Sequence, residues 1–169
     1  MKITEEQKEK LENIYQAFLN DEKILRMKDI SMHRGSNCYE HSFKVAKKAI
    51  KKSLNRKDVN LEVVLLGAIL HDYYLYDWRK DRSKLKKHGK NHPGIAIENA
   101  IKDFNIPDEV KKVIISHMWP INIKDYPKSK EAKIVSISDK EVTIVESMTT
   151  KKYKQKKREK YLSYISHLF

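Results

Sequence analysis

Residues 61–76 read LEVVLLGAILHDYYLY, and the segment before the histidine is apolar on nearly every face. A helix that is apolar all round lies in the centre of a protein, because no side of it is suited to water. A strand is the alternative, but the run is long for a strand and contains Gly67 and Ala68, which strands disfavour. The stretch therefore predicts a buried central helix with His71 and Asp72 near its C-terminal end.

Apolar side chains recur at helical spacing along most of the remaining chain. Thr4 with Gln7 resembles a capping box, and Asn91-His92-Pro93 is typical of a helix start, because proline is favoured in the first turn. Four glycines and four prolines are few for a fold with many strands and turns. We therefore expect an all-α fold, a single compact helical bundle with about seven helices. The expected helices besides the central one cover approximately residues 4–19, 37–54, 91–104, 107–118, 130–148 and 151–169.

The chain has 169 residues, which predicts one domain over residues 1–169. Its core is expected at about 33–148, with the basic C-terminal helix 151–169 packed on that core. No stretch approaches the roughly 20 apolar residues that cross a bilayer, and the first residues, MKITEEQKEKLENIY, lack the apolar segment of a signal peptide. The single Cys38 fits a reducing compartment. These features predict a cytoplasmic protein with no membrane partner.

The formal net charge is +13, and lysine supplies almost all of the excess. A charge of this size attracts anionic ligands over a long range. Proteins that bind phosphates through paired hydrogen bonds favour arginine instead, and abundant Ile, Asn and Lys are also typical of an AT-rich genome. The charge therefore favours a small anionic partner, and nucleic-acid binding is the less favoured interpretation.

Several histidines and aspartates fall on faces that the helical pattern turns inward. His117 lies seven residues after Val110, and Asp139 lies four residues after Val135, so both share a face with buried positions. A buried carboxylate is unfavourable unless it is paired or bound to a cation. Nitrogen and oxygen donors without cysteine suit Mn, Fe, Co, Ni, Zn or Mg. The alternative is a structural network, for example Asp139 hydrogen-bonded to His71.

Three segments resemble the HD superfamily, whose members are mostly metal-dependent phosphohydrolases. The segment YEHSFKVAKKA, residues 39–49, resembles the helix of the first histidine. The segment LLGAILHDYY, residues 65–74, resembles the apolar run that ends in His-Asp, and KIVSISDKEV, residues 133–142, resembles the helix of the final aspartate. The resemblance extends over about residues 33–148. A lone His-Asp dipeptide carries no weight, whereas four ligands in order, each in the right helical setting, are specific.

The resemblance implies a helical fold with a divalent metal centre of one or two ions. His41, His71, Asp72 and Asp139 would bind the first ion, and His71 and Asp72 would be the catalytic pair. Some branches hold a second ion with two further histidines, and His92 and His117 stand where those would be; Asp72 would then bridge the ions. A metal at such a site lowers the pKa of bound water and polarises a phosphoryl oxygen.

Departures from the family limit the substrate. His117 is followed by Met118-Trp119-Pro120, so the Gly-Tyr-Pro motif of the cyclic-dinucleotide phosphodiesterases is missing. A small phosphate ester, with nucleotides as the expected class, is the substrate that we predict. Candidates for contacting it are Arg34, Arg79, His88 and Lys140, because guanidinium and ammonium groups bind phosphate and His88 lies four residues before His92. Each of them can instead be an ordinary solvated side chain.

Two other functions stay open at this point. The first is a di-iron oxygenase, since the same scaffold supports oxygen chemistry elsewhere in the superfamily. The second is a nucleic-acid-binding or partner-binding module that uses the basic segment KKYKQKKREK, residues 151–160. Binding of that kind is strongly salt-sensitive.

Overall fold

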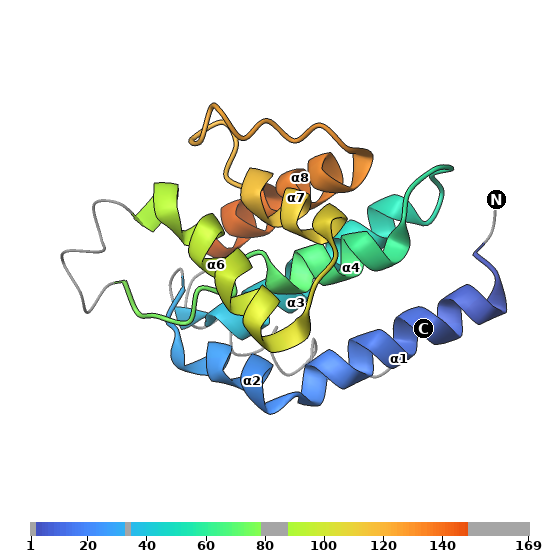
Figure 1. Ribbon diagram of the computed structural model, residues 1–169, viewed down its shortest axis with the longest axis horizontal. Helices are drawn as coiled ribbons and strands as arrows, with labels where there is room; N and C mark the ends of the chain where they lie inside the picture. Colours follow the sequence, from blue (N-terminus) through green and yellow to red (C-terminus); the bar gives the residue numbers. More distant parts are fainter. Residues whose placement is uncertain (1–2, 33–34, 79–87, 149–169) are drawn as a thin grey trace.

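The computed structural model describes residues 3–32, 35–78 and 88–148, and these residues form helices and connecting loops (Figure 1). An isolated β-bridge joins Ser31 to Asn37. The all-α prediction is confirmed, and in the described ranges we find no helix that is both long and apolar enough to cross a membrane. The helices are α1 (Glu5–Asn20), α2 (Glu22–Leu25), the 3-10 helix η1 (Arg26–Asp29), α3 (Cys38–Ser53), α4 (Leu61–Leu70), α6 (His88–Phe104), α7 (Asp108–Ser116) and α8 (Lys130–Met148).

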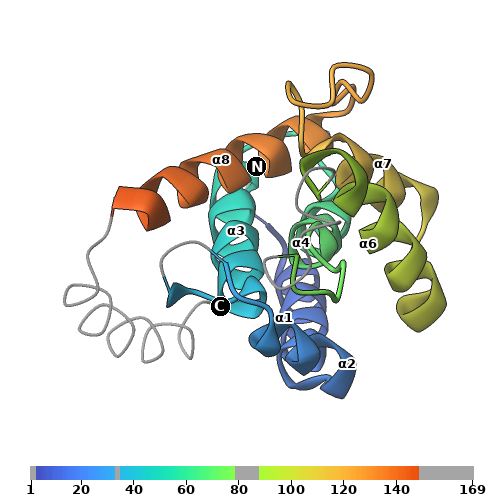
Figure 2. The same ribbon diagram turned by 90° about the vertical axis from the view of Figure 1, so that its left-hand side faces the viewer.

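Helix α4 is the central element, as its sequence predicts. Seven of its ten residues are buried, and it packs against α1, α3, α6, α7 and α8. Figure 2 shows α3 and α4 side by side, with α8 running across them and α6 and α7 on the other side of α4. Because the helix is surrounded, the residues at its C-terminal end are delivered into the interior of the bundle.

Side-chain caps define where the helices begin. Thr4 and Gln7 form the predicted capping box of α1, since each side chain bonds the backbone N–H of the other. The side chain of Asn37 accepts a hydrogen bond from the first turn of α3, and the side chain of Asn60 does the same for α4. Such caps satisfy backbone donors that have no partner within the helix.

The structure differs from the sequence prediction at two places. Helix α6 begins at His88 and not at Asn91, so Pro93 lies inside the helix. Residues 22–29 form α2 and η1, which the apolar pattern did not reveal because each contains only four residues. The expected C-terminal helix 151–169 lies outside the described residues.

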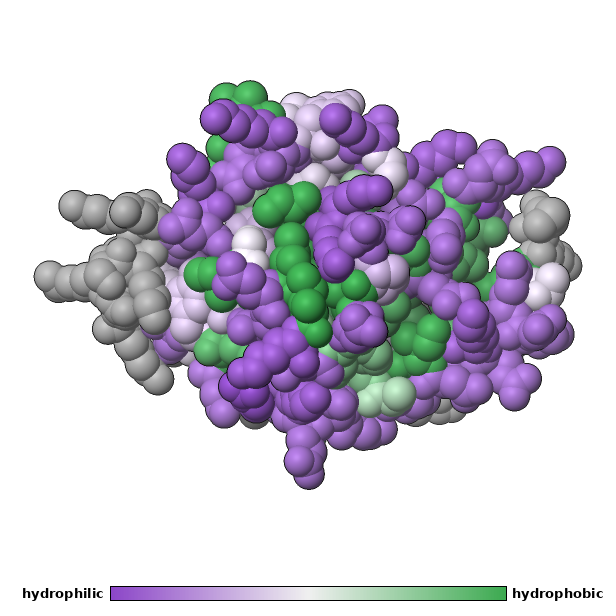
Figure 3. Space-filling view, in the orientation of Figure 1, coloured by the Kyte–Doolittle hydropathy of each residue, from purple (hydrophilic) through white to green (hydrophobic). Residues whose placement is uncertain are grey.

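The surface agrees with the charged composition. Figure 3 shows hydrophilic side chains over most of one face, with apolar side chains gathered in small areas between them. The most exposed of the large apolar side chains in the described ranges are Ile121 and Ile123, between α7 and α8, and Met148 at the end of α8. Single exposed apolar residues of this kind are normal in folded proteins.

Gly67 sets how closely α7 approaches α4. A Cβ atom on Gly67 would lie 2.5 Å from Cγ1 and 2.9 Å from Cβ of Val113. We expect Gly67→Ala to lower the free energy of unfolding by about 1–3 kcal/mol, because it overpacks this contact. Urea unfolding followed by circular dichroism measures the change.

Gly94 provides the matched control. It lies within α6, and a Cβ atom added there would meet no neighbouring atom within 4 Å. Gly94→Ala should raise stability by about 0.5–1 kcal/mol, because alanine is the better helix former. Adding Val113→Ala to Gly67→Ala should recover part of the loss. Equal effects of the two glycine substitutions would contradict the proposed contact.

Candidate metal centre

Six side chains that the sequence singled out come together in one buried cluster. His41 comes from α3, His92 from α6 and Asp139 from α8, while His71 and His117 stand at the C-terminal caps of α4 and α7. Asp72 follows His71 directly. All six are buried. Their ligand atoms fall into two groups, which we call the first trio, His41, His71 and Asp139, and the second trio, Asp72, His92 and His117.

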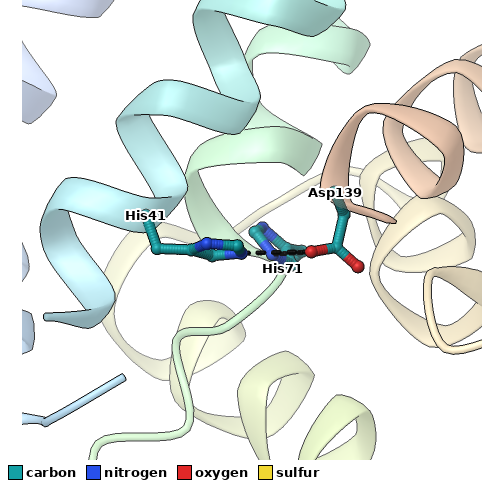
Figure 4. A group of neighbouring side chains, drawn as sticks. All are labelled: His41, His71 and Asp139. Carbon is teal, nitrogen blue, oxygen red and sulfur yellow. Dashed lines mark hydrogen bonds and ion pairs between the residues drawn. The ribbon is translucent and has the colours of Figure 1, made fainter. Parts of the chain in front are cut away.

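The first trio lies between three helices. His41 Nε2 is 3.1 Å from Asp139 Oδ1, and His71 Nε2 is 3.8 Å from the same oxygen. Figure 4 shows His41 and Asp139 pointing toward each other from opposite sides, with the ring of His71 beside their contact. One donor atom from each residue lies within 4.8 Å of the others. A single cation can therefore be reached by all three.

The second trio is built around one oxygen of Asp72. His92 Nε2 lies 3.2 Å and His117 Nε2 lies 3.6 Å from Asp72 Oδ1. The two Nε2 atoms are only 2.9 Å apart. The other oxygen of Asp72, Oδ2, faces the first trio and lies 3.4 Å from His71 Nε2. Asp72 therefore stands between the trios with one oxygen toward each.

Backbone carbonyl groups fix the orientation of three of the four imidazoles. The Nδ1 atoms of His71, His92 and His117 lie 2.7–2.8 Å from the carbonyl oxygens of Ala68, His88 and Ile114. A carbonyl oxygen can only accept, so each Nδ1 carries the hydrogen and donates it. The neutral ring then has its lone pair on Nε2, which points into the cluster. This is the form of histidine that binds a metal.

The donor set fits a divalent cation. His71 Nε2 is buried and makes no hydrogen bond with any of the residues that the structure describes. The predicted alternative of Asp139 hydrogen-bonded to His71 does not apply here, because 3.8 Å is too long for a hydrogen bond. Two Nε2 lone pairs facing each other also require a positive charge between them. Imidazole nitrogens and carboxylate oxygens in this arrangement are suitable ligands for Mn, Fe, Co, Ni or Zn.

Electrostatics in the cluster keep His117 neutral and favour positive charge at His41. Burial lowers the pKa of His117 to about 3, with help from the neighbouring His92 and His71. Burial also acts to lower the pKa of His41, but hydrogen bonds to Asp139 and Glu146 outweigh it and raise that pKa to about 10. Burial opposes ionisation of Asp139, yet His41 and His71 hold its pKa well below the usual range. The carboxylates stay charged, and the surroundings of His41 favour a cation, either a proton or a metal ion.

Glu146 also belongs to the site, although it is not among the residues expected from the sequence. Its Oε2 lies 2.9 Å from His41 Nδ1, and its Oε1 accepts a hydrogen bond of 2.7 Å from Lys44 Nζ. The residue is 4% exposed. A sequence signal existed, because Glu146 lies seven residues after Asp139 and so shares its face of α8.

The predicted substrate contacts lie in different settings. Lys140 Nζ donates to the carbonyl oxygen of His117 and to Ser136, so it connects α8 to the end of α7. The ring of His88 stacks between Trp78 and His92, with centroid distances of 4.8 and 4.6 Å. Substrate binding by these two residues stays a prediction. Arg34 and Arg79 lie outside the described residues.

Comparison with known proteins adds one finding. The model of the HD domain family matches residues 38–143. No curated protein and no solved structure matches the chain. The matched range covers more than half of the chain and includes all six residues of the two trios. The chain therefore belongs to the HD domain family.

Proposed function

We propose that this protein is a metal-dependent phosphohydrolase that cleaves a small phosphate ester, with a nucleotide as the substrate class. Membership of the HD family indicates a metal-dependent hydrolase. The observation that carries the finer proposal is the position of Asp72, which turns one oxygen toward each trio. Two cations that share a carboxylate are a common arrangement in enzymes that hydrolyse phosphate esters.

Each residue has a defined part in this proposal. His41, His71 and Asp139 would hold one ion and His92 and His117 would hold the second, and Asp72 turns one oxygen toward each trio. Divalent ions bound there would supply a water of lowered pKa and would polarise a phosphoryl oxygen. The hydrogen bonds from three Nδ1 atoms to backbone carbonyls keep the Nε2 lone pairs directed at the ions.

A cysteine nucleophile is not supported by the surroundings of Cys38. The side chain is fully buried, and its Sγ donates a hydrogen bond to the backbone carbonyl of Asp72 at 3.1 Å. Burial, together with the charge of Asp72, raises the pKa of the thiol well above its usual value. The thiol therefore stays protonated and supports the backbone at Asp72, and an activated water is the nucleophile that fits this site.

Two features support a nucleotide. The net charge of +13 attracts phosphate-bearing ligands. Trp78 is partly exposed, and its ring stacks on His88, which in turn stacks on His92 of the second trio. Aromatic rings of this kind pack well against a planar base. A bound nucleotide could place its phosphate at the ions and its base near these rings.

Metal analysis combined with an activity screen tests the proposal. The purified protein should contain a divalent metal by mass spectrometry, and it should hydrolyse nucleotides or other phosphate esters when Mn²⁺, Co²⁺, Ni²⁺ or Mg²⁺ is added. Tightly bound iron without any phosphatase activity would favour an oxygenase. Salt-sensitive binding of DNA or RNA that disappears when residues 151–169 are deleted would favour a binding module.

Asp72→Ala should abolish both metal binding and hydrolysis, because the carboxylate faces both trios. We expect activity to fall by more than about 100-fold, since even residues that only support a metal ligand contribute about 10–100-fold. Asp108→Ala is the matched control, because Asp108 is exposed and, among the residues that the structure describes, its ion-pair partner is Lys111 in the same helix. Circular dichroism should show an unchanged helical fold for both variants. Normal metal content in Asp72→Ala contradicts the assignment.

His92→Ala tests whether the centre holds two ions. The change removes one ligand of the second trio and leaves His41, His71 and Asp139 in place. Metal content should fall from two ions to one per chain, and hydrolysis should fall with it. Equilibrium dialysis followed by metal analysis gives the count. A centre that still binds two ions after this change is not built as we propose.

A further inference from the structure

The four imidazoles of the centre differ in what their Nδ1 atoms contact. His71, His92 and His117 donate to neutral backbone carbonyls within their own helices. His41 alone faces a carboxylate, Glu146 Oε2, at 2.9 Å. A carboxylate that accepts a hydrogen bond from a ligand histidine raises the basicity of the opposite nitrogen, and a carbonyl does so less strongly. His41 is therefore the strongest of the four nitrogen donors.

The charges around the two trios are also unequal. The first trio contains its own carboxylate, Asp139, and has Glu146 directly behind it. The second trio contains two imidazoles, those of His92 and His117, and one carboxylate, that of Asp72. The other oxygen of Asp72 faces the first trio. Both Asp139 and Glu146 are buried, so solvent screens their attraction for a cation only weakly. Lys44 offsets the charge of Glu146. Asp139 belongs to the first trio alone, whereas Asp72 is divided between the trios, so the first trio still offers the larger negative charge to an incoming cation.

We propose that Glu146 is a positioning residue which, acting through His41, makes the first trio the tighter metal site, so that the two ions bind in a fixed order. The inference rests on the proposed metal centre. The first trio holds its ion firmly, and the second trio binds its ion more weakly and exchanges it more readily. Glu146 lies three residues beyond the end of the family match at residue 143.

The contact with Lys44 shapes how Glu146 acts. Lys44 lies one turn after His41 on α3. Its Nζ donates a hydrogen bond of 2.7 Å to Oε1, the other carboxylate oxygen of Glu146. The carboxylate is therefore held in one orientation, with one oxygen left for the imidazole. Because Glu146 also links α8 to α3, a purely structural role must be separated from the effect on the metal.

A second ion-pair group on the same two helices provides that separation. Glu141 of α8 pairs with Lys48 and Lys52 of α3 at 2.8 and 2.9 Å. It joins the same helices as Glu146 does, but none of its described contacts involves a residue of either trio. Glu141→Gln therefore weakens the link between α3 and α8 without changing the surroundings of His41.

The test is a Co²⁺ titration of the metal-free, full-length protein by isothermal calorimetry. Wild type should show one tight and one weaker binding event. Glu146→Gln preserves size and removes the charge, and it should weaken the tight event by about 10–100-fold while the weaker event is retained. Glu141→Gln should reproduce the wild-type titration. Identical titrations for Glu146→Gln and wild type, or equal losses in both variants, overturn the inference.

The His92→Ala background makes the measurement simpler, because only the first trio remains to bind Co²⁺. In that background, Lys44→Met should leave the tight event in place, since the carboxylate still faces His41, whereas Glu146→Gln should weaken it. If both substitutions weaken Co²⁺ binding equally, Glu146 acts only by holding α8 against α3, and the inference is overturned. A wild-type protein that binds no Co²⁺ overturns the metal centre itself. Two equal binding events in wild type leave the centre intact and overturn only the order.

Discussion

The carboxylate of Asp72 is buried among four imidazoles, and this burial constrains much of the fold. An aspartate can be brought to the middle of a bundle only by an element that is itself surrounded, and α4 is such an element because nearly all of its faces are apolar. Gly67 lets α7 come close enough for His117 to reach Asp72 Oδ1. The buried charge is tolerable because the donors around it converge on positions that a cation can occupy.

At the ends of α4 and α7, one hydrogen bond from a histidine both pairs a helix carbonyl group and orients the imidazole. The last carbonyl groups of a helix have no partner within it, and leaving them unpaired in the interior is unfavourable. His71 and His117 are the C-cap residues, and their Nδ1 atoms bond the carbonyls of Ala68 and Ile114, three residues back. The same bonds turn both Nε2 atoms toward the centre. Helix termination and ligand orientation therefore depend on each other.

Helical periodicity predicts which residues face inward. It does not predict residues such as Glu146, whose burial depends on a partner far away in the chain. The continuous apolar run revealed α4, and helical spacing placed His117 and Asp139 on inner faces, where the structure has them. Glu146 carries a charge that is normally solvated, and its partner His41 is 105 residues away in the chain. The sequence predicts a start of α6 that is three residues too late, because proline usually marks the first turn of a helix. Here Pro93 lies in the sixth position.

Two lysines beside the centre are already engaged within the described part of the protein. Lys44 pairs with Glu146, and Lys140 donates to the carbonyl of His117 and to Ser136. Burial also lowers the pKa of Lys140, and its ammonium group is directed at protein acceptors. Within the described residues, metal ions held by the two trios as proposed would therefore be the strongest positive charge at the centre. The lysine-rich surface acts at longer range, where salt screens it, so it affects the rate of encounter more than the chemistry.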